Sequence, residues 1–410
     1  MDKRDAKIEK LIIQLCPNGV ERKAFGEVAT IVRGASPRPI HSFLTEARNG
    51  IPWIKIGDIA PGEKYITGTA EHVTAAGAEN SRRVYPGDFV LSNSMSFGRP
   101  YISKIEGCIH DGWLSISNFN AALIPDFLYH LLRSAPIQTE FARRAGAGTV
   151  KNLNADIVKS VRIPVPPLRV QEEIARTLDN FTKLEAELEA ELEARRKQYE
   201  YYREELLTFE KGVEFKALGE VGTLIRGSGL QKNDFIEDGV GCIHYGQIYT
   251  YYGTYTDKTK SFVSQELAKS LKKVNKGDLV ITSTSENIED VCKAVAWLGE
   301  DEIVTGGHAT ILKHNENPKY LSYYFRTASF SNQKRKYAKG TKVIDVCAKD
   351  LAKIRVPIPT LAEQERIVGV LDRFDALVND ISIGLPAELN ARRKQYEYYR
   401  DKLLTFAPLK

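Results

Sequence analysis

The sequence lacks the features that mark membrane-spanning, secreted and disulfide-rich proteins. It has no run of about 18 apolar residues, so we expect no transmembrane helix. It begins MDKRDAKIEK, which is charged and contains no apolar signal region. The five cysteines are scattered and odd in number, a usage typical of a reducing compartment. We therefore predict a cytoplasmic protein of two to three domains.

Charge of one sign is not in large excess. The chain carries 58 basic and 53 acidic residues, a net charge of +5. This small excess permits a nucleic-acid partner without requiring one, so any DNA site must be argued from local patches.

Catalytic and metal-binding motifs are also missing. The sequence contains no G-x-x-x-x-G-K-[ST] loop, no G-x-G-x-x-G after a strand and no H-E-x-x-H. Cys108-x-His110 and Cys242-x-His244 form a repeated pair, but they lie in different registers of the duplication described below, and neither has a second ligand pair. We predict no metal site, and the pattern indicates a binding protein rather than an enzyme.

What the chain does have is a tandem duplication. ARRKQYEYYR occurs at 194–203 and again at 391–400, and fourteen of sixteen positions agree when the match is extended to Phe209 and Phe406. Residues 163–181 match 356–374, and 19–34 match 212–227, both at an offset of 193. The likeness is strong at the edges of each unit and nearly absent inside. The matched edges therefore form a shared frame. It encloses two unlike segments, called here the fillings, which lie between residues 34 and 163 and between residues 227 and 356.

The frame is predicted to be helical. Apolar residues recur at alternating steps of four and three from Ile174 to Phe209, which is the heptad seam of a coiled coil. A helix over about 170–209 would be roughly 60 Å long. In the second copy Thr360 and Glu363 form a capping box, and Gly384 and Pro386 are expected to interrupt the helix.

Two features of this helix concern partners. The tetrad repeat LEAELEAELEA at 184–194 is acidic, so we expect it to face its twin helix, solvent or a protein rather than DNA. Within YEYY, Tyr199 and Tyr202 fit the seam and Tyr201 points outward, with the same pattern at 396–399. The predicted subunit interface comprises Tyr199, Tyr201, Tyr202, Arg203, Tyr396, Tyr398, Tyr399 and Arg400. A surface tyrosine lying along its own helix is the alternative.

Each filling of about 150 residues reads as an α/β module with short strands and two apolar-faced helices. Basic clusters follow the second helix in both copies, and polar loops at 92–100 and 282–290 occupy equivalent places with different letters. Basic side chains beside glycine suit phosphates, and Ser, Asn and Arg suit base edges. Solvated charge runs and ordinary turns are the alternatives. The predicted DNA contacts are Arg33, Arg38, Ser92, Asn93, Ser94, Arg99, Arg143, Arg144, Lys151, Arg226, Ser283, Ser285, Asn287, Lys334, Arg335, Lys336, Lys339 and Lys342.

The stretches IPVPPLRVQEEIARTLDNF, GLPAELNARRKQYEYYRDKLLTF, GVEFKALGEV and SNSMSFGRPY closely resemble the specificity subunits of type I restriction-modification systems, which serve in phage defence. The likeness covers nearly the whole chain. It implies an α/β fold with two target-recognition domains in tandem pseudo-twofold repeat, separated by two long helices that form an antiparallel coiled coil. The implied divisions are an N-terminal helix (1–18), recognition domain 1 (19–163), a central helix (164–210), recognition domain 2 (211–356) and a C-terminal helix (357–406).

The resemblance also implies a division of labour. Each recognition domain would read one half of a bipartite DNA site, and the helices would set the gap and dock the methyltransferase subunits, usually two. S-adenosylmethionine, ATP and Mg would be used by methyltransferase and restriction subunits, with no cofactor on this chain. Tetrads in the central helix are associated with gap length in this family, although the tetrads here lack the threonine of some members. A stand-alone tandem repressor and a coiled-coil scaffold are the alternatives.

Overall fold

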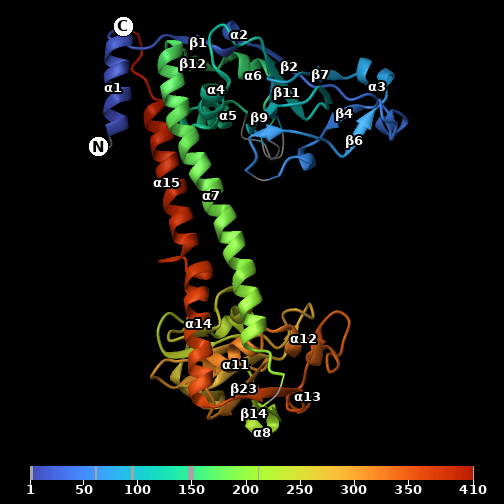
Figure 1. Cartoon of the computed structure of the whole chain (residues 1–410), viewed down its shortest axis with the longest axis vertical. Coiled ribbons are helices and arrows are strands. Elements are labelled where there is room, and N and C mark those ends of the chain that lie inside the picture. The colour runs from blue at the N-terminus through green and yellow to red at the C-terminus, as the bar shows by residue number, and fades with distance from the viewer. Residues whose placement is uncertain (1–2, 61, 94–96, 146–151, 211, 410) are drawn as a thin grey trace. The chain divides into compact units, whose positions relative to one another are not determined.

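The computed structural model describes residues 3–60, 62–93, 97–145, 152–210 and 212–409 (Figure 1). The chain divides into two compact units, each built from separate stretches of sequence. Unit 1 comprises Met1–Glu189 with Glu388–Lys410, and unit 2 comprises Ala190–Ala387. Within the described residues, none of the helices combines the length and apolar character needed to cross a membrane.

Unit 1 contains two five-stranded sheets. The first has the order β2-β11-β8-β9-β5, with bounds Thr30–Arg33, Trp113–Ser117, Phe89–Ser92, Pro100–Ser103 and Tyr65–Ile66. The second has the order β3-β6-β4-β10-β7, with bounds Leu44–Thr45, Glu71–Val73, Ile51–Ile54, Gly107–Ile109 and Arg82–Val84. All four residues of β8 are buried, because helices cover one face of its sheet and the second sheet covers the other.

Helices and a two-stranded ribbon complete the unit. The ribbon pairs β1 with β12, and the helices include the two apolar-faced helices that were predicted from sequence. Their bounds are β1 Arg22–Ala24, β12 Arg162–Pro164, α1 Lys3–Leu15, α2 Phe25–Val28, η1 Ile40–Ser42, η2 Ile56–Asp58, α3 Ala75–Glu79, α4 Pro125–Arg133, α5 Ala135–Arg144 and α6 Ala155–Ser160. Pro125 stands in the first turn of α4, where its missing N–H costs nothing, and Arg133 stands in the last.

Unit 2 repeats this strand order almost without change. Its first sheet runs β14-β23-β19-β21-β16, with bounds Gly222–Arg226, Ala309–His314, Leu279–Thr282, Ala294–Trp297 and Tyr255–Thr256. Its second sheet runs β17-β15-β22-β18, with bounds Ser261–Val263, Val240–Ile243, Ile303–Thr305 and Lys272–Val274. The fillings therefore share a topology although their letters share little.

The remaining elements of unit 2 mostly match those of unit 1, with β20 and β24 added as an extra pair. Their bounds are β13 Glu214–Ala217, α8 Leu218–Val221, η3 Lys232–Asp234, α9 Tyr245–Thr250, α10 Gln265–Ser270, β20 Thr284–Ser285, α11 Pro318–Tyr324, α12 Ala328–Arg335, β24 Ile344–Asp345, α13 Ala348–Leu351 and β25 Arg355–Ile358. Asn317 caps α11 by accepting from the backbone N–H groups of Lys319 and Tyr320.

The long helices have the predicted seam. Helix α7 spans Leu168–Leu206, α14 spans Leu361–Asn379 and α15 spans Leu385–Leu403. Every predicted seam position from 174 to 209 is buried or half-buried, whereas most positions between them are exposed. In unit 1, Phe181 of α7 stacks on Tyr399 of α15 with ring centroids 5.3 Å apart. Glu185, four residues after Phe181, pairs at 2.7 Å with Arg393, which precedes Tyr399 by six residues. These two helices therefore run antiparallel, as predicted.

The second copy of the frame is interrupted where Gly384 and Pro386 predicted. Helix α14 ends at Asn379, and a Cβ on Gly384 would lie 2.4 Å from the Ala376 carbonyl oxygen, so glycine is required at this close approach. Thr360 caps α14 by accepting from the Glu363 N–H. The Glu363 carboxylate pairs with Arg366 at 2.7 Å instead of completing the predicted capping box.

The segment after α1 meets the C-terminal segment of the chain within unit 1. The backbone N–H of Val20 donates to the Ala407 carbonyl at 2.8 Å, and the N–H of Leu409 donates to the Val20 carbonyl at 3.1 Å. Helix α1 lies along the long helices, because Lys7 pairs with Glu173 at 3.0 Å and Glu9 pairs with Lys402 at 3.2 Å (Figure 1). Segments from both ends of the sequence thus complete one core with the first filling.

Candidate nucleic-acid interface

In unit 1, three predicted DNA contacts come together at one edge of the first sheet. Arg33 ends β2 as expected, and its Nε donates to the Asp111 carbonyl at 3.1 Å. Asn93 follows β8 and donates from Nδ2 to the same carbonyl at 2.8 Å. Arg38 approaches the Asp111 carboxylate at 3.6 Å. The loop that contains Asp111 therefore joins segments that are far apart in sequence.

Asp111 was not predicted from sequence. The Ser36 hydroxyl donates to its carboxylate at 2.8 Å. This hydrogen bond is the leading cause that holds the pKa of Asp111 below its usual value, and the carboxylate is ionised at neutral pH. Nothing in the local pattern identifies Asp111, because its importance comes from the meeting of three strand ends.

Unit 2 builds the same edge with different side chains. The N–H of Ser283 donates to the His308 carbonyl at 2.8 Å, and the Thr284 hydroxyl lies 2.9 Å from His308 Nδ1. Arg226 ends β14, as predicted, and its side chain makes no hydrogen bond or ion pair with the described residues. The position of Asn93 in unit 1 is thus taken by Ser283, and that of Arg33 by Arg226.

The polar loop that follows Ser283 is held in a turn. Asn287 Nδ2 donates to the Asp290 carboxylate at 2.8 Å, and Asn287 Oδ1 accepts from the Asp290 N–H at 2.8 Å. Ser285 lies on β20, which pairs with β24. Predicted contacts Ser94 in the first loop and Lys151 beyond α5 lie outside the described residues.

The basic cluster of unit 1 is paired with residues of α5 and α6. Arg143 Nη2 and Arg144 Nη2 reach the Glu140 carboxylate at 2.9 and 2.6 Å, and Arg144 Nη1 also donates to the Ser160 hydroxyl at 2.7 Å. The two guanidinium groups hold the pKa of Glu140 at about 2. A phosphate at this place would have to compete with Glu140.

The basic cluster of unit 2 divides into buried, paired and free members. Lys334 is only 4% exposed, and its Nζ donates to the Glu289 and Val291 carbonyls at 2.9 and 2.8 Å. The ammonium thus fastens the polar loop to α12, and the contact of Lys334 with a phosphate stays a prediction.

Arg335 and Lys339 form ion pairs, with Glu289 at 3.8 Å and Asp350 at 2.9 Å. Lys336 and Lys342 are exposed, and their side chains make no hydrogen bond or ion pair with the described residues. They are the members of this cluster that can meet a phosphate without first losing a partner.

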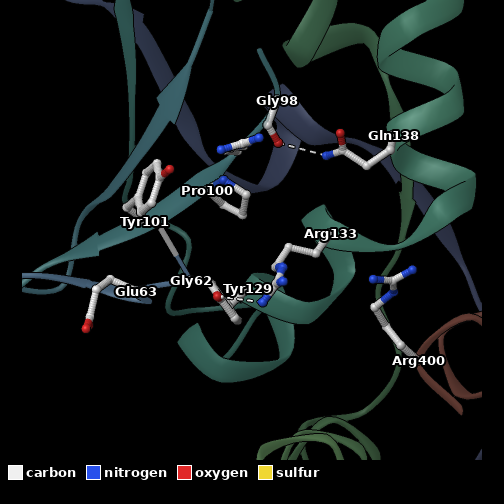
Figure 2. Close-up of a pocket in the computed structure, with 10 residues that line it drawn as sticks. Gly62, Glu63, Gly98, Pro100, Tyr101, Tyr129, Arg133, Gln138 and Arg400 are labelled. Carbon is white, nitrogen blue, oxygen red and sulfur yellow. Dashed lines mark hydrogen bonds between the residues drawn. The ribbon is translucent and has the colours of Figure 1, made fainter. Parts of the chain in front are cut away.

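A cationic cavity of 360 Å³ lies beneath the first polar loop. Arg99, Arg133 and Arg400 line it together with Tyr101 and Tyr129. Figure 2 shows Arg133 bonded to the Tyr129 hydroxyl, at 2.8 Å, with Arg400 entering the view from the side opposite Tyr101. The same view shows Gln138 donating to the Gly98 carbonyl, at 2.7 Å, which ties α5 to the loop. The structure thus brings Arg99, predicted for DNA, and Arg400, predicted for a subunit interface, to one anion-attracting cavity.

The tyrosines of the repeated decapeptide divide as predicted. Tyr199 and Tyr396 are buried, and Tyr202 stacks on Phe374 with centroids 5.4 Å apart, as Tyr399 does on Phe181. Tyr201 and Tyr398 are 63% and 62% exposed. The guanidinium groups of Arg203 and Arg400 lie over the Tyr199 and Tyr396 rings at 5.6 and 5.5 Å. Each unit therefore presents one exposed tyrosine on an ordered helix.

The acidic tetrads face other side chains of the frame. Arg393 of α15 pairs with Glu185 and Glu189, and Glu191 and Glu193 pair with Arg195 and Lys197 one turn on. Among the described residues, no group of three or more His, Cys, Asp or Glu side chains could hold a metal ion.

Comparisons with known proteins bear on this architecture. The family model for the type I restriction modification DNA specificity domain matches residues 17–194 and again 210–391. The EcoR124I/EcoR124II specificity subunit of Escherichia coli is 35% identical over 297 residues, which is 68% of this chain and 70% of that protein. A putative type I restriction enzyme specificity subunit of Haemophilus influenzae is 30% identical over 407 residues, 95% of this chain and 96% of its own length.

Solved structures share the fold. A chain from a study of complex assembly and conformational transition in the type I R-M system matches with a TM-score of 0.66 at 17% identity, covering 95% of this chain and 98% of that one. The S subunit of a type I system from M. genitalium matches with a TM-score of 0.50 at 14% identity, covering 94% and 96%. The chain therefore belongs to the DNA-specificity subunits of type I restriction-modification enzymes, in which catalysis is carried by partner subunits.

Proposed function

We propose that residues 19–163 and 211–356 form two recognition domains and that each reads one half of a bipartite DNA site. The observation that carries this proposal is the shared strand order of the two fillings, with different polar side chains on the same edge. Two half-sites of different sequence require two domains that share a fold but present different polar side chains to the bases.

The helices at 164–210 and 357–406 would set the gap between the half-sites. Helix α7 runs for 39 residues without a break, roughly 58 Å at 1.5 Å per residue, and it contributes to both units. Its acidic tetrads pair with Arg393 and with neighbouring basic residues, which suits a spacer that stays off the phosphates.

Tyr201 and Tyr398 would mark the docking places of two methyltransferase subunits, one on each copy of the decapeptide. An exposed tyrosine beside arginine on a rigid helix is typical of a protein interface, and the two copies are identical in letters. Tyr199, Tyr202, Arg203 and their counterparts pack beneath them. Restriction subunits would complete the enzyme.

The cofactors would belong to these partners. S-adenosylmethionine would serve adenine methylation, and ATP with Mg would serve translocation and cleavage. The system would work in the cytoplasm, where all five cysteines would keep the free-thiol state that they have here.

The test is to co-express the chain with its methyltransferase subunits and to map the methylated adenines. We expect a bipartite sequence with a fixed gap, and no methylation when either component is omitted. Tight sequence-specific binding by the chain alone would favour the stand-alone repressor. An absence of salt-dependent DNA affinity, with partners present, would favour the scaffold.

A further inference from the structure

One motif remains unexplained by the proposed function. The hexapeptide G-C-I-H-x-G occurs as 107–112 and as 241–246. The two copies are 134 residues apart (244 minus 110), whereas the duplication has an offset of 193, so they are not copies of one ancestral position. In unit 1 the motif lies on β10, and in unit 2 it lies on β15.

The fold nevertheless brings both copies to the same edge. In each second sheet two central strands run parallel, β4 beside β10 in unit 1 and β15 beside β22 in unit 2. The carboxyl ends of parallel strands meet at one edge, which is where α/β sheets bind ligands. By strand order β15 corresponds to β4, and β22 corresponds to β10. His110 therefore follows one strand of the parallel pair, and His244 follows the counterpart of the other strand.

The histidine and the glycine form a turn with a defined tautomer. The N–H of Gly112 donates to His110 Nδ1 at 2.9 Å, and the N–H of Gly246 donates to His244 Nδ1 at 3.2 Å. A Cβ on Gly112 would lie 2.4 Å from His110 Cε1, so a larger residue there would displace the His110 ring. Because Nδ1 accepts, the ring proton resides on Nε2, and none of the described residues accepts a hydrogen bond from that atom.

Both histidines are neutral donors in an aromatic setting. Burial lowers the pKa of His110 and of His244 below the usual 6.5. His244 is 5% exposed, and its ring centroid lies 4.4 Å from that of Tyr245, while the ring centroids of His110 and Trp53 lie 6.1 Å apart. The cysteine of each motif belongs to the core, since burial raises the pKa of Cys108 and raises that of Cys242 to about 12. A thiolate metal ligand is therefore disfavoured.

Each histidine lines a cavity at this edge. The cavity in unit 1, of 390 Å³, is lined by Ser36, Arg38, Trp53, Lys55, His110 and Asp111, among others. The cavity in unit 2, of 490 Å³, is lined by Arg226, Gln231, Lys232, His244, Tyr245 and His308, among others. We call these the H-x-G pockets. Arg38 and Arg226, predicted for DNA, stand in them.

The polar linings differ in one decisive respect. The H-x-G pocket of unit 1 combines the His110 donor with the ionised Asp111 carboxylate, which is an acceptor. The pocket of unit 2 has no carboxylate among its lining residues and combines the His244 donor with Arg226 and Lys232. In the major groove adenine offers an acceptor beside a donor, at N7 and N6, whereas guanine offers two acceptors, at N7 and O6.

We propose that each H-x-G pocket receives the edge of one base of its half-site, selected by the Nε2–H of His110 or His244. The pocket of unit 1 takes adenine, because Asp111 accepts from the amino group, and the pocket of unit 2 takes guanine, because its other donors meet O6. This inference rests on the proposed function, since it requires that each unit reads DNA.

The test uses the complete complex with its methyltransferase subunits and a DNA library randomised in both half-sites. His110→Gln is expected to lower the preference for adenine at one position of half-site 1, roughly tenfold or more, with half-site 2 unchanged. His244→Gln is expected to do the same for one guanine of half-site 2. The unaffected half-site reports that each variant has folded and assembled. His72→Gln, on β6 and outside the pocket lining, is the matched control and should change neither half-site.

Two further measurements sharpen the test. Asp111→Asn should weaken the choice of adenine over guanine at the same position that His110→Gln relaxes. The part of the affinity that His110→Gln removes should not vary between pH 7 and 8, because the ring, with its pKa below 6.5, is a neutral donor over this range. A loss of that part with rising pH would instead identify a cationic histidine on a phosphate and would overturn the inference.

The two proposals fail in different ways. Unchanged base preferences in both histidine variants, with wild-type methylation of a bipartite site, would overturn the pocket inference and leave the proposed function standing. A uniform loss of methylation at every sequence would also overturn it. A wild-type complex that methylates no bipartite site would overturn the proposed function itself.

Discussion

The fillings of the two units share their strand order and little else. Sheet β2-β11-β8-β9-β5 corresponds to β14-β23-β19-β21-β16, and the second sheets agree in four strands. Yet at the equivalent edges Asn93 of unit 1 corresponds to Ser283 of unit 2, and Gly112 corresponds to His308, since the N–H of Asn93 donates to the Gly112 carbonyl as the N–H of Ser283 donates to the His308 carbonyl. The core requires only apolar side chains of suitable size at alternating positions, so many sequences satisfy it. At the reading edge, Asn93 and Ser283 are buried and bond to neighbouring loops, whereas the basic side chains of Arg33, Arg38 and Arg226 are exposed. Residues of the edge lie outside the apolar cores, so core packing does not fix which polar residue stands there.

The largest effect should come from exchanging one filling for the other. The N–H of Leu153 donates to the Asn93 carbonyl at 2.8 Å, and the N–H of Val346 donates to the Ser283 carbonyl at 2.9 Å. Gly34 corresponds to Gly227, so residues 34–153 and 227–346 are matched segments. Replacing the first by the second should convert the target into two copies of half-site 2 and abolish methylation of the original site. Methylome sequencing measures this. Persistence of half-site 1 would mean that the reading surface lies outside the fillings.

A smaller effect should follow from shortening the frame that both fillings share. Deleting residues 188–191 removes about 6 Å of helix while keeping the same face, and one base pair advances about 3.4 Å along DNA. Because the helices need not lie parallel to the duplex, we expect the gap to change by about one base pair, with both half-sites intact. Replacing the same four residues by alanines is the control and should leave the gap unchanged. Altered half-sites in the deletion would contradict a spacer role.

The two basic clusters should differ in their share of phosphate binding. Changing Lys336 and Lys342 to glutamine should lower the salt slope of DNA affinity by roughly one to two, since each free cation contributes about 0.9. Changing Arg143 and Arg144 should lower it less, because Glu140 already neutralises part of their charge. Binding titrations of the complete complex at several salt concentrations measure both slopes. Equal slopes in the two double variants would show that the Glu140 pairing is irrelevant to DNA.

The smallest effect concerns stability and pH. His130 has no exposed side-chain surface and bonds to Tyr396 and Asp179, whereas the matching residue of unit 2, Tyr323, bonds to Asp372. Burial lowers the pKa of His130 below 6.5 in spite of Asp179. The unfolded chain therefore binds the extra proton first, and stability is lost as the pH falls below 6.5, at about 1.4 kcal/mol per pH unit at most.

Urea unfolding followed between pH 7.5 and 5.5 checks this expectation. The pKa of Asp179 lies below its ordinary 3.8, so that group does not titrate in this window. His130→Gln keeps polar atoms at the site without the titration and should make the dependence shallower, while the lowered pKa values of His110, His244 and His314 maintain the remainder. A wild-type profile that matches the variant would show that folded His130 takes up the proton as readily as the unfolded chain.

The features that depend on spacing along one helix were predictable. The seam of α7, the outward Tyr201 and Tyr398 and the break at Gly384 all follow from periodicity and from glycine and proline positions. The shared topology of the fillings was not, since strand order arises from pairings between distant segments. The burial of Lys334 was missed because it depends on the loop at 289–291 that folds over it. The two G-C-I-H-x-G motifs were correctly placed in different registers, yet only the parallel pairing of their strands reveals their common edge.

The hydrogen bonds between Val20 and residues 407–409 give the backbone the character of an almost closed ring. The segment 404–409 follows α15 and contacts the start of the first filling through hydrogen bonds, without a covalent link to it. The stretch 207–213 follows α7 in the same way, but it continues covalently into the second filling. A permuted gene that starts at Gly212 and joins Leu409 to Val20 would lose α1 but would encode both sheets of each unit and the helices between them.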